Sequence, residues 1–159
     1  MKLYHGSNVS IDSIDLAKGK KGKDFGAGFY LSDDKEQAFE MAKTTVFRTG
    51  KGEPIITEFW FDDTLLKGNT SLSIKVFEGY TEEWAEFILK NRSNKSDVRI
   101  HNYDIVIGPI ADDAVGVQIR RYIQGYISVS QLAKELTYIH PTIQYFFGTD
   151  EAIKSSKRI

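Results

Sequence analysis

Hydrophobic and aromatic residues gather in short runs, some alternating with polar residues, at six places along the chain. Short runs rich in β-branched and aromatic side chains, bounded by glycine, proline or polar residues, are typical of β-strands. The alternation over 72–77 is the weakest of the six. The predicted strands are residues 2–5, 29–31, 55–61, 72–77, 105–107 and 142–147.

Between these runs, apolar residues recur at helical spacing. Ala38, Ala42 and Val46 lie four residues apart, and the polar residues 32–34 can cap the helix that carries them. A solvated loop is predicted over 91–97. Further helices are predicted from residue 81, over 115–126 and 129–136, and as a tail helix over 151–159.

This order of elements predicts an α+β fold in a single domain, residues 1–159. The strands are short and separated by unlike elements, which favours α+β over a doubly wound sheet. A chain of 159 residues with 41% hydrophobic and 13% aromatic residues can bury its own core, and its composition is not that of a disordered protein.

Several classes of protein are excluded by what the chain lacks. It has no cysteine, which removes a disulfide framework, a thiolate zinc site and a cysteine nucleophile. His5, His101 and His140 do not have metal-ligand spacing, so no metal site is expected. No signal-peptide pattern and no run of about 18 apolar residues is found, and we expect a cytoplasmic protein with no membrane partner.

Charge is nearly balanced, with 21 Lys and Arg against 22 Asp and Glu and a net charge of −1. This balance argues against a general polyelectrolyte binder, but it allows a local basic patch. Lys18, Lys20, Lys21 and Lys23 form the one dense cationic run. We interpret it either as a solvated loop or as a contact for phosphate or nucleic acid.

Glycines stand beside a histidine and a tyrosine near the ends of the first two predicted strands. His5 is followed by Gly6, and Gly26 and Gly28 precede Tyr30. Glycine lets a ligand approach the main chain, and an aromatic face near a histidine can hold a planar cationic ring. The alternative is that these are core-edge residues and turn formers. A dinucleotide-binding Rossmann motif is excluded, because its glycines follow a strand and open a helix.

The residues 4–7 (Tyr-His-Gly-Ser) and 24–32 (Asp-Phe-Gly-Ala-Gly-Phe-Tyr-Leu-Ser) resemble the first two blocks of the His-Tyr-Glu branch of the ADP-ribosyltransferase superfamily, which includes the poly(ADP-ribose) polymerases. The chain is most similar to a bacterial family of initially unknown function related to that branch. Further matching blocks follow in the family's order at residues 83–84, 91–92, 103–113, 144–147 and 149–153.

The resemblance implies an ADP-ribosyltransferase-like fold: two small, mostly antiparallel sheets around a cleft that binds NAD as a substrate, with flanking helices. His5 would bind the adenosine-side ribose, the Gly6 main chain the nicotinamide amide, and Tyr30 would stack on the nicotinamide ring. The residues implied to bind NAD are His5, Gly6, Ser7, Gly26, Gly28, Tyr30 and Ser32. The implied activity is mono-ADP-ribosylation by a toxin or effector.

The third block departs from the family pattern, because Gln144 stands where the catalytic glutamate usually lies. A carboxylate there binds the ribose 2′-hydroxyl and offsets the positive charge of an oxocarbenium-like transition state. An amide can bind hydroxyls without supplying charge, so we expect transfer to a single acceptor rather than chain elongation. Glu151 is an off-register alternative. A non-catalytic module that keeps the fold and the NAD cleft is the second hypothesis.

Four further residues have a structural and a functional interpretation. Asp112 and Asp113 are expected to cap a helix, or alternatively to orient an acceptor or Arg92. Asp24 is expected in a turn or in the cleft, and Arg92 in solvent or against a pyrophosphate. The acceptor, whether protein or nucleic acid, and any neutralising antitoxin are not identified by the sequence.

Overall fold

The computed structural model describes residues 1–136 and 141–159, with Asp113 described by its backbone alone; His140 lies outside the described residues. The described chain folds into strands β1 (Lys2–Ser7), β2 (Phe29–Ser32), β3 (Ile55–Phe61), β4 (Ile74–Val76), β5 (Ile105–Pro109), β6 (Ile143–Phe147) and β7 (Ser156–Arg158), helices α1 (Lys35–Thr49), α2 (Glu82–Ser93), α3 (Asp113–Ile123), α4 (Val129–Glu135) and α5 (Asp150–Ile153), and two 3-10 helices, Leu16–Lys18 and Asp63–Lys67.

The fold is α+β, as predicted, but the expected two sheets are not seen. Within the described residues the strands form one seven-stranded sheet in the order β4-β5-β6-β2-β1-β3-β7. Its neighbours are antiparallel except for the parallel pair β4–β5. The reason for the single sheet is one bridge: β1 pairs with β2 only at Tyr4 and Ser32, whereas β1–β3 and β2–β6 pair along their length.

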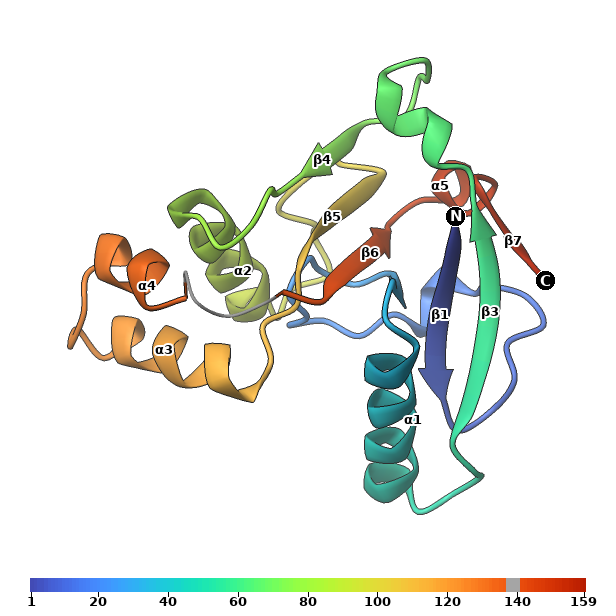
Figure 1. The fold of residues 1–159 in the computed structure, drawn as a ribbon, viewed down its shortest axis with the longest axis horizontal. Coiled ribbons are helices and arrows are strands. Elements are labelled where there is room, and N and C mark those ends of the chain that lie inside the picture. Colours follow the sequence, from blue (N-terminus) through green and yellow to red (C-terminus); the bar gives the residue numbers. More distant parts are fainter. Residues whose placement is uncertain (137–140) are drawn as a thin grey trace.

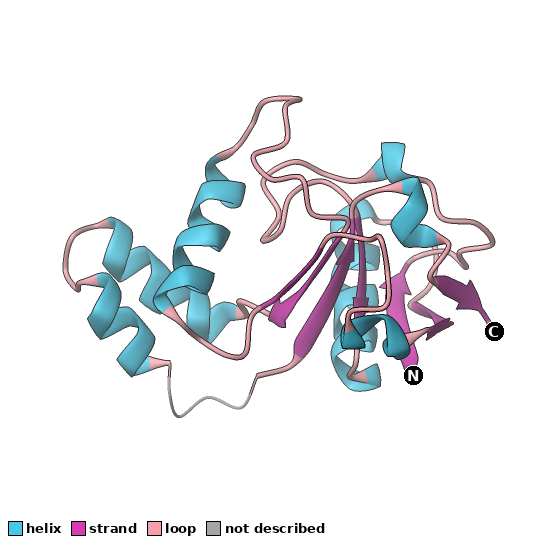
Figure 2. Ribbon diagram, turned by 90° about the horizontal axis from the view of Figure 1, so that it is seen from above, coloured by secondary structure: helices cyan, strands magenta, loops and turns pink. Residues whose placement is uncertain are grey.

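Two hydrophobic cores lie on opposite faces of this sheet, because successive side chains of a strand alternate between faces. On β6, Phe146 belongs to the first core, and Tyr145 and Phe147 belong to the second. The helices α2, α3 and α4 gather at one end of the molecule, and α1 lies beside β1 (Figures 1 and 2).

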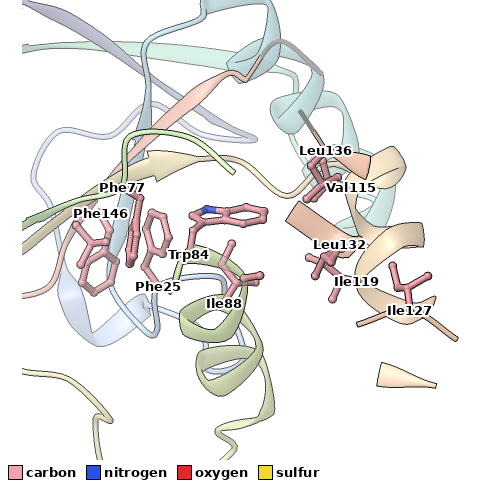
Figure 3. Packing of buried hydrophobic residues seen from close by; sticks show 12 residues of the cluster. Phe25, Phe77, Trp84, Ile88, Val115, Ile119, Ile127, Leu132, Leu136 and Phe146 are labelled. Atoms are coloured by element: carbon pink, nitrogen blue, oxygen red, sulfur yellow. The ribbon is translucent and has the colours of Figure 1, made fainter. Parts of the chain in front are cut away.

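The first core joins the sheet to the three helices. The indole of Trp84, on α2, lies between a group of phenylalanine rings and the aliphatic side chains of α3 and α4 (Figure 3). It is fully buried, and its Nε1 donates to the carbonyl of Pro109 at 3.1 Å. The rings and side chains around it are Phe25, Phe77 and Phe146 on one side, and Val115, Ile119, Leu132 and Leu136 on the other.

Helix α1 packs against β1 at Gly6. A Cβ placed on this glycine would lie 1.7 Å from the Ala38 carbonyl oxygen, so no other residue fits without moving the helix. The side chain of Asp34 caps α1 by accepting from the main-chain N–H groups of Glu36 and Gln37, as the polar run 32–34 predicts. Ala38 and Ala42 are its buried residues.

The predicted tail helix over 151–159 is wrong. Helix α5 ends at Ile153, and the chain then forms β7, which pairs with β3. The hydroxyls of Ser155 and Ser156 donate back to the carbonyls of Ala152 and Ile153, which competes with further helix bonds. Pairing with a distant strand therefore decides the structure of the tail.

Several predicted boundaries also shift. The strand predicted over 72–77 is only three residues long, and α2 extends into the predicted loop at 91–97 as far as Ser93. Within this extension Asn91 is buried and donates from its side-chain amide to the Phe87 carbonyl one turn earlier. The helix predicted over 115–126 begins two residues earlier, after the cap Asp112, and ends at Ile123.

Candidate functional site

Three blocks that are far apart in the sequence meet on neighbouring strands. Tyr4 of β1 pairs with Ser32 of β2, and Ser32 pairs with Gln144 of β6. His5 adjoins the same junction, since its Nδ1 lies 2.8 Å from the Tyr30 carbonyl oxygen. The point where the two halves of the sheet join is therefore also where the predicted site residues gather.

His5 is held in one tautomer. Its Nδ1 must donate to the Tyr30 carbonyl, which can only accept, so the neutral ring has Nε2 as an acceptor. The imidazole stacks on Phe29 with centroids 4.4 Å apart. Burial lowers the pKa of His5, and the backbone hydrogen bond to Tyr30 opposes this shift. His5 therefore suits a neutral acceptor for a ligand hydroxyl.

Tyr30 is a fixed part of the first core rather than an open stacking platform. Its hydroxyl donates to the Gly26 carbonyl at 2.6 Å and accepts from the Phe25 N–H at 3.0 Å. Its ring lies edge-on to Phe146. Burial raises the pKa of Tyr30 well above its ordinary value. This packing locks the phenol in place, and the stacking of Tyr30 on a ligand ring stays a prediction. His5, by contrast, stacks on Phe29 of the second core.

The small residues of the first two blocks have defined structural roles. Gly28 lies against the Phe146 ring, which a Cβ would meet at 2.2 Å. Gly26 has a φ of +98°, which disfavours any residue with a side chain. The Ser32 hydroxyl is buried and accepts from the Asp34 N–H, and the Ser7 hydroxyl donates to Asn8.

A polar network joins Gln144 to two residues that the sequence left undecided. Asp24 forms an ion pair with Arg92, with 2.7 Å between Oδ1 and Nε. The Gln144 Nε2 donates to Asp24 Oδ2 at 3.0 Å and to the Pro109 carbonyl at 3.3 Å. The loop before α3 completes the network, because the Ala111 N–H donates to Asp24 and its carbonyl accepts from Arg92.

This pairing of Asp24 with Arg92 and Gln144 was missed in the sequence. Arg92 and Gln144 are 68 and 120 positions from Asp24 along the chain, and no local pattern links them. The only signal is that Asp24 opens the second block and Arg92 and Gln144 belong to later ones. The network places a buried amide, a carboxylate and a guanidinium in one cluster.

The other acidic candidates do not join this cluster. The Asp112 side chain caps α3 by accepting from the Val115 N–H at 3.0 Å, the structural role expected of it. Asp113 is the first residue of α3. Glu151 is exposed on α5 and pairs with Lys154 at 2.9 Å, past the far end of β6. Glu151 therefore lies outside the Asp24 and Gln144 network.

The basic loop lies beside the segment that follows α2. Lys21 forms an ion pair with Asp97, and Gly22 lies against Lys95. Lys23 is half-buried, and its pKa is lowered by burial first and then by the nearby cations of Arg48, Lys20 and Arg92. Positive charge is thus concentrated next to the Asp24 network.

A hollow of about 360 Å³ separates the basic loop from that segment. A second hollow, of about 470 Å³, shares Ile100 and His101 with the first. The predicted residues His5, Tyr30 and Gln144 line neither of these two hollows. Residues that line the first include Lys21, Gly22, Gly26, Asn91, Arg99 and His101.

His101 was not predicted as part of any site. Its Nε2 donates to the Phe25 carbonyl at 2.7 Å and its Nδ1 accepts from the Tyr103 N–H, so it is a neutral ring that supports the second block. Burial lowers the pKa of His101. Among the described residues, no group of three or more His, Asp or Glu side chains could hold a metal ion. In the same part of the chain, no helix combines the length and apolarity needed to cross a membrane.

Comparison with known proteins places the chain in one family. Neither the curated proteins nor the solved structures include a match to it. A family model described as "Protein of unknown function (DUF3990)" matches residues 1–157, nearly the whole chain. The chain therefore belongs to the DUF3990 family.

Proposed function

We propose that this protein is an NAD-dependent mono-ADP-ribosyltransferase with an ADP-ribosyltransferase-like fold. The observation that carries the proposal is that the three blocks lie side by side on the strands β1, β2 and β6, where Tyr4 pairs with Ser32 and Ser32 pairs with Gln144. The three blocks are far apart in the sequence and lie together in the fold. A ligand that contacts all three blocks would bind at this junction.

The proposed reaction breaks the bond between C1′ of the ribose and the nicotinamide nitrogen. Nicotinamide leaves with the electron pair of that bond, and a nucleophile of the acceptor bonds to C1′ and gives up its proton. His5 offers Nε2 as an acceptor for a ribose hydroxyl. Gln144 contributes a neutral amide, which orients a hydroxyl without adding negative charge. A site with this amide favours one transfer over elongation.

Labelled NAD tests the proposal directly. Incubation of the protein with NAD and with candidate protein or RNA acceptors is expected to release nicotinamide and to move the ADP-ribose label to one of them. Tyr30→Ala is expected to abolish release, because it removes the phenol that fixes Phe25 and Gly26. Tyr126→Ala, at an exposed tyrosine, is the matched control and should release nicotinamide normally.

Tyr30→Phe guards against a trivial loss of folding, since it keeps the ring in the core and removes only the hydroxyl. Circular dichroism should show Tyr30→Phe folded, and its release of nicotinamide should fall below that of the wild type, because the hydrogen bonds to Phe25 and Gly26 are lost. If the wild-type protein neither binds nor cleaves NAD, the proposal is wrong.

A second candidate function is a non-catalytic NAD-binding module. The observation that favours it is the amide of Gln144, which is tied to Asp24 and Pro109 and carries no charge. Calorimetry separates the two functions. Binding of NAD without release of nicotinamide would support the module. Release of nicotinamide in the presence of any of the acceptors would support the enzyme.

A further inference from the structure

Both hydrogens of the Gln144 side-chain amide are already used. Nε2 donates one to Asp24 Oδ2 at 3.0 Å and the other to the Pro109 carbonyl at 3.3 Å. Both partners are pure acceptors, so rotation of the amide by 180° would set its oxygen against two oxygens. The orientation of the amide is therefore fixed by its neighbours.

The amide oxygen, Oε1, takes no part in this network. Gln144 as a whole is 7% exposed, and within the described residues no donor contacts Oε1. No buried side-chain nitrogen or oxygen in that same part of the chain lacks a partner. An unpartnered Oε1 must therefore be reached by solvent, and it is the one hydrogen-bonding position of this amide that a ligand can use.

Asp24 is itself held rigidly. Its carboxylate accepts from Arg92 Nε on one oxygen and from Gln144 and the Ala111 N–H on the other. Its side chain is 14% exposed. Arg92 also donates to the Ala111 carbonyl at 3.2 Å, so the network closes into a ring. A carboxylate held by three donors sets the direction of the bond to Gln144.

A glutamate would not fit in the place of Gln144 in this chain. One of its oxygens would lie where Nε2 lies, about hydrogen-bond distance from two acceptors and with no proton to share. Two carboxylates at that distance repel each other when both are ionised, so the pKa of one of them rises strongly. The amide at position 144 and the carboxylate at position 24 therefore go together.

We propose that Asp24 is a positioning residue, which holds the Gln144 amide so that its Oε1 accepts a hydrogen bond from a hydroxyl of the substrate. The inference rests on the proposed function, in which that hydroxyl belongs to the ribose of NAD. The Asp24 carboxylate then does not touch the substrate. It holds, through one hydrogen bond, the Gln144 amide that does.

The first test is Asp24→Asn, which removes the charge and frustrates the ring of hydrogen bonds. Loss of a hydrogen bond to a charged group costs about 1.5–3 kcal/mol, so kcat for nicotinamide release should fall about 10- to 100-fold. KM for NAD should change less than kcat, because a misdirected amide is felt most in the transition state. Asp62→Asn, at an exposed helix cap that asparagine serves equally well, is the control and should keep wild-type kinetics.

The second test exchanges the two groups. Gln144→Glu alone should lower activity and stability at neutral pH, because it creates a carboxylate pair. The double variant Asp24→Asn/Gln144→Glu removes the carboxylate pair and lets the asparagine amide donate to the glutamate, so it should be more active than the worse single variant. It should stay below the wild type, because the glutamate oxygen still faces the Pro109 carbonyl. Equal or additive losses in the double variant would overturn the proposal.

A readout without NAD keeps the inference separate from the proposed function. In nuclear magnetic resonance, the two side-chain amide protons of Gln144 should exchange slowly with solvent in the wild type and rapidly in Asp24→Asn. Slow exchange with no NAD turnover would leave the positioning role standing and remove the proposed function. The wild type could instead turn over NAD while Asp24→Asn shows the same kcat and the same amide-proton exchange. That result would remove the positioning role of Asp24.

Discussion

His5 and His101 are both neutral rings held by backbone carbonyls. In each, burial is the main cause of a lowered pKa, and a hydrogen bond to a carbonyl opposes it. Two histidines from distant parts of the chain thus support consecutive segments of the second block, one at Tyr30 and the other at Phe25. Protonation of either ring would place a charge in a site built for an uncharged group.

The lowered pKa of His5 predicts a loss of stability in acid. As the pH falls through the unfolded-state value of about 6.5, the unfolded chain takes up a proton that the folded chain resists, so the free energy of unfolding falls. His5→Gln keeps a donor for the Tyr30 carbonyl and removes the titration. Denaturant unfolding between about pH 5 and pH 7.5 should show a shallower pH dependence in His5→Gln than in the wild type.

The remaining slope of that variant should come from His101, so His5→Gln/His101→Gln should flatten it further. An unchanged slope in His5→Gln would contradict the shifted pKa.

A glutamate at position 144 should make the free energy of unfolding depend on pH in the opposite direction. The raised pKa of one carboxyl in the pair means that the folded Gln144→Glu variant binds more protons than the unfolded chain above about pH 4.3. Its free energy of unfolding should therefore decrease as the pH rises, until the raised pKa is passed. Thermal unfolding at pH 5 and pH 8 measures this, with Gln118→Glu, beside Arg121 on α3, as the control that shows no such decrease. A variant no less stable at pH 8 would show that the carboxylates do not meet.

At the scale of elements, the packing of α1 on β1 depends on Gly6. In Gly6→Ala the new methyl group would lie 1.7 Å from the Ala38 carbonyl, so the helix must shift. Overpacking of this kind costs about 1–3 kcal/mol or more, and it also moves the main chain beside His5. Denaturant unfolding should show that destabilisation, together with reduced NAD binding.

Gly116→Ala is the contrasting variant. Gly116 lies within α3 with nothing within 4 Å of a new Cβ, so the substitution should stabilise the protein by up to about 1 kcal/mol. Equal effects of the two substitutions would show that α1 tolerates displacement from β1.

The elements were predictable where a local pattern decides them. The β-branched and aromatic run over 55–61 and the alanine spacing of α1 correspond to observed elements. The tail was not predictable, because β7 exists through its pairing with Phe59 and Phe61, residues almost a hundred positions away. Site residues follow the same rule. The identity of Gln144 was evident in the sequence, whereas its bond to Asp24 depends on how β6 and the loop that carries Asp24 are brought together.

At the scale of the whole molecule, a net charge of −1 leaves only local patches for binding anions. Lys18, Lys20 and Lys23 make no ion pair within the described residues, whereas Lys21 is neutralised by Asp97. If RNA is the acceptor, replacing the three unpaired lysines by alanine should weaken RNA binding. The slope of log K against log salt should become shallower by about 0.7 for each phosphate that the loop no longer neutralises.

Lys21→Ala should have a smaller effect than any of these three. Alanine substitutions at the exposed Lys67, Lys134 and Lys157 form the control for total charge. Fluorescence titration of a labelled single-stranded RNA at several salt concentrations measures both the affinity and its salt slope. Equal weakening in the loop variant and the control would assign any binding to net charge alone.

The strand order has a consequence for how copies of this protein meet one another. The sheet ends in β4 on one side and β7 on the other, and each is only three residues long. Lys75 stands in the middle of one, and Lys157 and Arg158 in the other. Outer strands this short offer little unsatisfied backbone to a second sheet, and the charged side chains on them disfavour burial in such a contact. The shortness of β4 and β7 therefore limits edge-to-edge pairing between copies of this protein.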